Sequence, residues 1–199
     1  MEDETEQIEI RKNRLFGIEE QPYMFTIATT NMILRGDGKS NLENQDFLAQ
    51  NPSKIQLKGC TIGMMNPPYS QGSKQNPELY EINFVNHLLE SLAEGAKVAV
   101  IVPQSTFTGK TKDEQNLKVK ILKNHTLEGI ITLNKNTFYG VGTNPCIGIF
   151  TAGISHSKTK KAKFINFEND GYIVSKHIGL IDDGSAKDKK QHLLDVWND

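Results

Sequence analysis

Short apolar runs alternate with amphipathic stretches along most of this chain, from about residue 13 to residue 167. Runs of strand length occur at 14–19, 40–47, 60–65, 97–102, 127–133, 145–151 and 161–167. Apolar residues at helical spacing predict a helix over 78–93. Helices are also expected over 22–34, where Pro22 suits a first helical turn, and over 113–124. Gly36 and Gly38 are expected to end the first of these helices. The continuously apolar run KVAVIV at 97–102 predicts a strand buried on both faces.

The order of these elements predicts an α/β fold, with a doubly wound, mostly parallel sheet covered by helices on both faces. The last strands of the series are joined by loops instead of helices, whereas a parallel crossover needs about a dozen residues or more and is usually helical. We therefore expect an antiparallel strand pair late in the chain. Residues 1–12 are charged and are expected to be solvated or to form a helix. Residues 182–192 are charged and poor in apolar side chains, which predicts a linker or a surface loop.

Composition and charge limit the functional classes. The 199 residues, of which 37% are hydrophobic, suffice for one domain with a substantial core. The 23 basic and 24 acidic residues give a net charge of −1, so no global positive field favours binding to DNA phosphates. A DNA-binding protein of this composition would need a local basic patch or a separate DNA-reading subunit.

The two cysteines and the lack of long apolar stretches indicate the compartment. Cys60 and Cys146 lie in apolar runs without Cys-x-x-Cys or Cys/His spacing. We therefore expect buried thiols in a reducing compartment, and neither a disulfide nor a metal site. No apolar stretch approaches the ~20 residues of a membrane span, and the acidic N-terminus lacks the apolar core of a signal peptide. These features predict a soluble, cytoplasmic protein without a membrane segment.

The tetrapeptide Asn66-Pro67-Pro68-Tyr69 follows a predicted strand, and open α/β sheets bind ligands at the carboxyl ends of their strands. Its two prolines remove two backbone donors. The Asn66 side-chain oxygen and the proline carbonyls therefore make the position rich in acceptors, and Tyr69 adds a flat ring. Such a set suits an adenine extruded from a duplex, whose amine needs acceptors and whose ring needs a stacking surface. The alternative is a proline turn with an asparagine cap, because Asn-Pro and Pro-Pro are common loop dipeptides.

Three ordered stretches resemble the N6-adenine DNA methyltransferases, and most of all the modification subunits of type I restriction systems. They are LFGIEEQPYMFTIATTNMILRGDG, then IGMMNPPYSQG with the later GAKVAVIVPQSTF, and then NTFYGVGTNPCIGIF. The resemblance implies a partial methyltransferase catalytic domain over 13–167, an N-terminal charged segment over 1–12, and a C-terminal extension or linker over 168–199. It implies methyl transfer from S-adenosylmethionine to adenine-N6 in DNA, without a metal, within a restriction-modification system. The implied partners are DNA and either a sequence-specificity subunit or a complementary methyltransferase segment.

The resemblance also implies residues that hold the cofactor. Glu19 matches the acidic residue that bonds the ribose hydroxyls of S-adenosylmethionine, with Glu20 as a competing candidate. Asp46 matches the residue that holds the amino group of the cofactor adenine. The alternatives are a solvated carboxylate at a strand end for Glu19 and a turn aspartate for Asp46.

The same resemblance implies residues that bind the target base. Asn66, Pro67 and Tyr69 match the target-adenine site, and Pro68 completes the motif. Asn66 and the Pro67 carbonyl are then expected to accept the protons of the amine, so that its lone pair points at the methyl carbon. Phe138 is either a second aromatic ring that packs against the flipped base or a residue of the core.

The glycine-rich turn that this family carries after its first strand has no counterpart here. It should precede the acidic residue by about 20 residues. Only 18 residues precede Glu19, and positions 1–16 contain no glycine. We therefore expect an excised fragment, one half of a split enzyme, or a truncated product without activity. Two other classes stay open: a restriction-system interaction subunit without catalysis, and an unrelated nucleotide-binding α/β protein.

Overall fold

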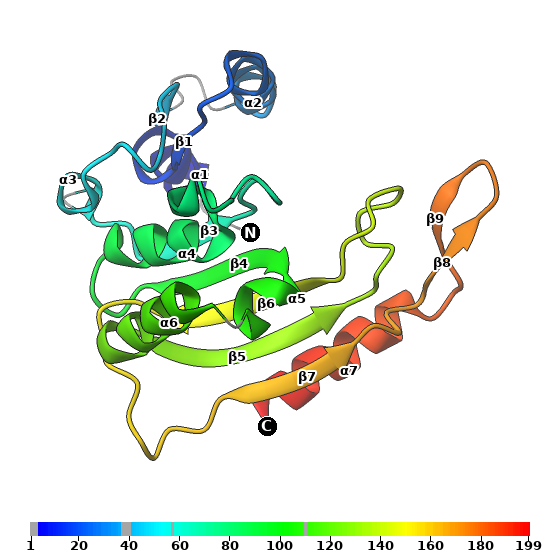
Figure 1. Cartoon of the computed structure of the whole chain (residues 1–199). Coiled ribbons are helices and arrows are strands. Elements are labelled where there is room, and N and C mark those ends of the chain that lie inside the picture. The colour runs from blue at the N-terminus through cyan, green and yellow to red at the C-terminus, as the bar shows by residue number, and fades with distance from the viewer. Residues whose placement is uncertain (1–3, 37–40, 57, 110) are drawn as a thin grey trace. The chain divides into compact units, whose positions relative to one another are not determined.

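The computed structural model describes residues 4–36, 41–56, 58–109 and 111–199 (Figure 1). The chain divides into two compact units, Met1–Cys60 and Thr61–Asp199, which we call the N-terminal and C-terminal units. Within the described ranges, no helix is long and apolar enough to cross a membrane.

The N-terminal unit is built around two short parallel strands. Its elements are α1 (Glu4–Glu9), the π-helix η1 (Ile10–Arg14), β1 (Phe16–Ile18), α2 (Pro22–Leu34), β2 (Asn41–Glu43) and α3 (Pro52–Gln56). Strand β1 pairs with β2 in parallel. The predicted helix over 22–34 is confirmed, with Pro22 in its first turn, where the missing backbone donor costs nothing. Gly36 follows this helix with φ 88°, whereas Gly38 lies outside the described residues.

The C-terminal unit contains a five-stranded sheet and a separate hairpin. Its first half comprises β3 (Ile62–Met65), the 3-10 helix η2 (Pro77–Leu79), α4 (Glu81–Glu90), β4 (Lys97–Pro103), α5 (Gln104–Thr108) and α6 (Lys112–Asn124). Its second half comprises β5 (Thr126–Leu133), β6 (Pro145–Thr151), β7 (Lys163–Phe167), the hairpin strands β8 (Tyr172–Ser175) and β9 (Gly179–Asp182), and α7 (Ala186–Asn198).

The sheet has the order β3-β4-β6-β5-β7, and it is mixed. Strand β3 pairs with β4 in parallel, and β5 pairs with β7 in parallel. Strand β6 lies between β4 and β5 and is antiparallel to both. The expected antiparallel pair late in the chain is therefore confirmed: loop 134–144 is a reversal between β5 and β6, with no crossover helix.

One face of this sheet is buried by helices that the sequence predicts. Val98, Val100 and Val102 alternate along β4 and are at most 1% exposed, because alternate residues of a strand share one face. Helix α4 contacts β4, and α6 contacts β5 (Figure 1). Gly63 of β3 lets the segment just after α4 approach closely, because a Cβ at this position would collide with the Leu92 side chain. Thr111 and Glu114 begin α6 with a capping box, which satisfies two helix-end donors.

The opposite face is less covered than the apolar run KVAVIV predicts. Ala99 and Ile101 of β4 are only partly buried, so the expectation that this strand is buried on both faces is wrong within the described residues. Helix α7 covers this side of the sheet near β5 and β7, where Trp197 lies over Gly129. An apolar run reports the character of both faces of a strand but not whether a helix reaches each of them.

Two further expectations need correction. Residues 182–192 are not a linker, because β9 ends at Asp182 and α7 begins at Ala186. Asp188 and the lysines of this stretch lie in α7 and are mostly exposed, whereas Asp182 and Asp183 precede the helix. The charged N-terminal segment is helical from Glu4 onward, as the second of its two interpretations proposed. The predicted helix 78–93 is shorter, because Pro77–Leu79 forms a separate 3-10 turn before α4.

Strands β1 and β3 are among those with an open edge within the described part of the chain. Strand β1 pairs only with β2, and β3 pairs only with β4. As a consequence β3 is an edge strand in the described sheet, although its apolar sequence suggests a central one.

His125 makes the stability of the C-terminal unit depend on pH. Its Nδ1 accepts a hydrogen bond from the Gly153 N–H at 2.9 Å. Burial lowers the pKa of His125 below 6.5, and the nearby Lys120 lowers it further. The Glu90 carboxylate raises this pKa, but its effect is smaller than that of burial. On acidification the unfolded chain therefore takes up this proton first. Stability is intact above pH ~6.5 and is lost as the pH falls toward the folded pKa.

We expect the urea midpoint of the chain to fall between pH 7.5 and 5.5, and His125→Asn to flatten this dependence. Asparagine keeps an acceptor for Gly153 but does not titrate. The matched control is His192→Asn on α7, an exposed position at which the pH dependence should remain. Equal slopes in the wild type and in His125→Asn would show that His125 is not the titrating group.

Candidate target-base site

The Asn66–Tyr69 motif leaves the carboxyl end of β3, as the sequence predicts. Pro67 is buried, Tyr69 is half-buried, and Asn66 and Pro68 are exposed. Within the described residues the Asn66 side-chain amide has no hydrogen-bond partner. The motif therefore has a buried proline that anchors it and an exposed amide that is free to bind a ligand.

Tyr69 is fixed in place by contacts from two other segments. Its hydroxyl donates to the Ile101 carbonyl of β4 at 3.1 Å. Its ring meets the Phe138 ring edge-on, with centroids 5.8 Å apart and an interplanar angle of 74°. Burial, together with the nearby Cys146 and Glu81, raises the pKa of Tyr69 to about 12, so the phenol is neutral at physiological pH. The structure thus brings together two of the predicted site residues, Tyr69 and Phe138.

Ser70 directly follows the motif and has a left-handed backbone. Its φ is 60°, a conformation that costs an L-residue roughly 1–2 kcal/mol. The Ser70 N–H donates to Glu81 Oε1 at 2.8 Å, and Glu81 lies in the first turn of α4. The carboxylate therefore holds the strained turn that ends the motif. Sequence reasoning missed Glu81; its only signal was an acidic residue near the start of a predicted helix, 11 positions after Ser70.

We expect Glu81→Ala to destabilise the chain by about 1–2 kcal/mol, because a charged acceptor is lost from a strained turn. Glu81→Gln should lose less, since its amide oxygen can still accept from Ser70. In the Glu81→Ala background, Ser70→Gly should recover part of the loss, because glycine adopts positive φ freely. Urea unfolding measures all three. The control Glu78→Ala removes an exposed carboxylate from the neighbouring 3-10 helix and should be neutral. If Ser70→Gly restores no stability in this background, the backbone of Ser70 is not the source of the loss.

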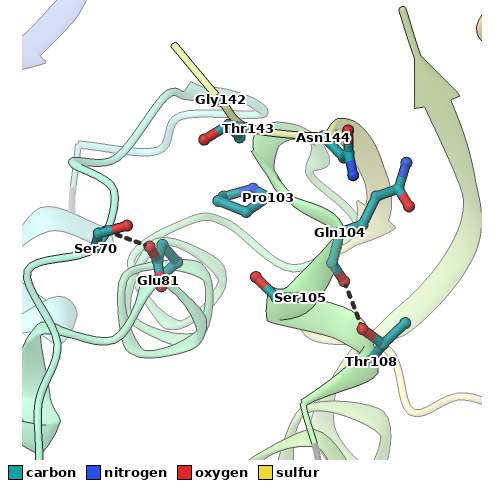
Figure 2. A pocket seen from close by; sticks show the side chains of 9 residues that line it. All are labelled: Ser70, Glu81, Pro103, Gln104, Ser105, Thr108, Gly142, Thr143 and Asn144. Carbon is teal, nitrogen blue, oxygen red and sulfur yellow. Dashed lines mark hydrogen bonds between the residues drawn. The ribbon is translucent and has the colours of Figure 1, made fainter. Parts of the chain in front are cut away.

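A pocket of about 440 Å³ opens beside the motif (Figure 2). It is lined by Ser70, Glu81, Pro103, Gln104, Ser105, Thr108, Gly142, Thr143 and Asn144. These residues come from three places: the turn after Tyr69 with α4, the end of β4 with α5, and the loop that leads into β6. The Gln104 N–H donates to the Asn144 carbonyl at 2.9 Å and joins the last two of these walls. The lining is mostly polar, and only sequence-distant contacts assemble it.

The two predicted cofactor residues lie in the N-terminal unit. Glu19 follows β1 and Asp46 follows β2, and the two strands run in parallel, so both carboxylates lie beyond carboxyl strand ends. The Asn44 side chain donates to the carbonyls of Glu19 at 2.8 Å and Glu20 at 2.9 Å, which ties the two strand ends together. Asp46 Oδ1 accepts from the Leu48 N–H at 2.8 Å, as a turn aspartate does. A shared crevice with the Asn66–Tyr69 motif stays a prediction.

The remaining polar clusters do not point to a metal. Among the residues that the structure describes, no group of three or more His, Cys, Asp or Glu side chains could hold one. Cys146 is buried, and its burial raises the pKa of the thiol to about 12, so it is an inert thiol. Cys60 is partly buried and also free.

The sequence profile of the N-6 DNA methylase family matches residues 1–187. The chain belongs to this family. RM.BcgI of Heyndrickxia coagulans, a type II restriction enzyme and methyltransferase, is 52% identical to this methylase chain over 196 residues. That alignment covers 98% of the chain and 31% of the relative, so the chain spans less than a third of that relative's length.

Solved structures agree with the fold of this methylase chain. The type I restriction-modification methyltransferase subunit from Streptococcus thermophilus superposes with a TM-score of 0.71 at 20% identity, covering 92% of this chain and 42% of that one. The M protein of the type I restriction enzyme EcoKI superposes with a TM-score of 0.64 at 20% identity, covering 76% and 34%. The chain therefore has the α/β fold of S-adenosylmethionine-dependent methyltransferases, with a mixed, partly antiparallel sheet.

Proposed function

We propose that this chain carries the target-base part of a DNA adenine-N6 methyltransferase that acts in a restriction-modification system. The observation that carries the proposal is the exposed Asn66 amide, which has no hydrogen-bond partner among the described residues. It follows the carboxyl end of β3 and lies three positions before Tyr69, whose ring meets that of Phe138. Membership of the N-6 DNA methylase family supports the reaction class. RM.BcgI is named as both a restriction enzyme and a methyltransferase, which supports the biological setting.

The residues of the motif have complementary roles toward a flipped adenine. The Asn66 side-chain oxygen and the Pro67 carbonyl accept the two hydrogens of the exocyclic amine, which withdraws its lone pair from the ring and makes it more nucleophilic. Proline at positions 67 and 68 leaves no N–H to compete as a donor. Tyr69 offers a ring face for stacking, and Phe138 supports that ring edge-on. Alignment of the two reactants, together with these fixed dipoles, supplies most of the acceleration.

The cofactor of the proposed reaction is S-adenosylmethionine, which supplies a methyl group on a positively charged sulfur. The described residues fit one half of this molecule. Glu19 uses one carboxylate oxygen to accept from the Gln21 N–H at 2.8 Å, so the other oxygen can accept a ribose hydroxyl. Asp46 keeps an exposed oxygen for an amino group. The methionine half needs a close backbone approach, for which positions 1–16 offer no glycine.

The proposed partners follow from what this chain lacks. A net charge of −1 favours a separate subunit or domain for reading the DNA sequence. The open edges of β1 and β3 fit a complementary methyltransferase segment that brings the glycine-rich turn. We call such a combination the completed enzyme; it consists of this chain with a polypeptide that supplies the turn, such as the remainder of RM.BcgI.

The test is a transfer assay with tritiated S-adenosylmethionine and adenine-containing duplex DNA, followed by mass spectrometry of the digested nucleosides. The completed enzyme should produce N6-methyladenine and no other methylated base. Methylated cytosine, or no labelled DNA with any completing segment, would contradict the proposed reaction.

A further inference from the structure

The pocket beside Tyr69 contains groups that the proposed methyl transfer does not use. It begins at Ser70, the residue after the motif, and it includes Pro103, two positions beyond the Ile101 carbonyl that binds Tyr69. The opening therefore lies next to the proposed position of the target adenine, and the adjacent nucleotide of the same strand reaches it when its base is unstacked as well. Its volume of about 440 Å³ is within the ~300–1,000 Å³ of small-molecule sites.

Four side chains of this pocket have unused hydrogen-bonding capacity. Within the described residues, no hydrogen bond engages the side chains of Gln104, Ser105, Thr143 or Asn144. Figure 2 shows the amides of Gln104 and Asn144 close together at one side, with Ser70 and Glu81 at the other. Two amides and two hydroxyls can both donate and accept, which is the pattern that reads the edge of a nucleobase.

The charge of the pocket argues against a phosphate as its ligand. Among the residues that the structure describes, no lysine or arginine lines it, and the one charged group of its lining is the Glu81 carboxylate. A phosphate would meet repulsion there. A carboxylate instead accepts from an exocyclic amine, as aspartate and glutamate do from the N4 amine of cytosine. The Pro103 ring gives the pocket one apolar wall.

We propose that this pocket binds the nucleobase next to the target adenine in the same DNA strand, and that it prefers a base with an exocyclic amine over thymine. The proposal rests on the proposed function, since it takes the bound strand to be the one whose adenine lies at Asn66–Tyr69. Gln104 and Asn144 bind the base edge, and Glu81 accepts from its amine. The pocket thus contributes to sequence context separately from any specificity subunit.

The experiment is an NMR titration of the chain with nucleosides, with observation of the side-chain amides of glutamine and asparagine. The probe is 2′-deoxycytidine, with thymidine as the comparison, because deoxyadenosine would also occupy the target-adenine site. We expect deoxycytidine to shift the Gln104 and Asn144 amides saturably, with about tenfold higher affinity than thymidine. Inorganic phosphate is titrated separately and should leave both amides unshifted.

Matched variants assign the site. Gln104→Ala and Asn144→Ala should each weaken deoxycytidine binding several-fold, and neither removes a side chain that the fold uses. Gln191→Ala on the exposed face of α7 is the control and should leave deoxycytidine affinity unchanged.

Three results would each overturn the proposal: equal affinity for thymidine, deoxycytidine-induced shifts at other residues but not at the two amides, or tighter binding of phosphate. If deoxycytidine fails to bind while Asn66→Ala still abolishes transfer in the completed enzyme, the pocket assignment alone is wrong. If deoxycytidine binds but no N6-methyladenine forms, the proposed reaction fails instead.

Discussion

Asn66→Ala is expected to lower methyl transfer by the completed enzyme at least ~100-fold, while cofactor affinity stays nearly unchanged. The Asn66 amide is exposed and has no partner within the described residues, so its removal costs the fold little. Its proposed role is to hold the target amine with its lone pair directed at the methyl carbon. Loss of one such preorganised group removes an interaction that is strongest in the transition state, and the effect therefore falls on turnover.

Single-turnover transfer of tritiated methyl to DNA measures the chemical step, and calorimetry with S-adenosylmethionine measures cofactor binding. The matched control is Tyr69→Phe, which keeps the ring against Phe138 and loses only the hydrogen bond to the Ile101 carbonyl. Tyr69→Phe should lower the transfer rate far less than Asn66→Ala does. Tyr69→Ala removes the stacking face and should therefore lower the rate more than Tyr69→Phe. An active Asn66→Ala enzyme would mean that the family resemblance of this motif does not extend to its role.

The second large effect concerns the chain on its own. We expect the isolated 199-residue chain to show no detectable methyl transfer, and its affinity for S-adenosylmethionine to be weaker than that of the completed enzyme by orders of magnitude. A glycine-rich turn supplies backbone donors and close approach to the cofactor, and the chain has no such turn before Glu19. Each lost contact costs about 1 kcal/mol of binding free energy. Several such losses together weaken the affinity by orders of magnitude, because each 1.4 kcal/mol is a tenfold change.

The open edges of β1 and β3 add a physical consequence. Unpaired strand edges are templates for pairing with other chains, so the isolated chain should self-associate at concentrations where the completed enzyme does not. Calorimetric titration, the tritiated-methyl assay and light scattering test these expectations on the same preparation. Micromolar cofactor binding together with turnover by this chain alone would show that the glycine-rich turn is dispensable or has been misidentified.

Several elements are determined by the sequence alone, because their causes are local. Helix α2 begins at Pro22 and ends at Leu34 as this proline and the flanking Gly36 predict, and β6 has the predicted bounds Pro145–Thr151. The Asn66–Tyr69 motif lies at a strand end because an apolar run stops abruptly at two prolines. Short-range spacing, turn residues and steric limits on proline act over a few positions, and a sequence displays them directly.

The remaining features are decided by tertiary structure, because they depend on pairing between distant segments. No local pattern predicts that β6 inserts between β4 and β5, or that Phe138 meets Tyr69 edge-on. The charged stretch that suggests a linker becomes α7, since packing of Trp197 near Gly129 stabilises a helix whose composition alone is too polar to require one. The Ser70–Glu81 bond and the pocket beside it likewise form only when α4, α5 and the loop before β6 come together. A sequence thus specifies which groups are available near a strand end, whereas the register of the sheet and the burial of apolar faces determine which of them meet.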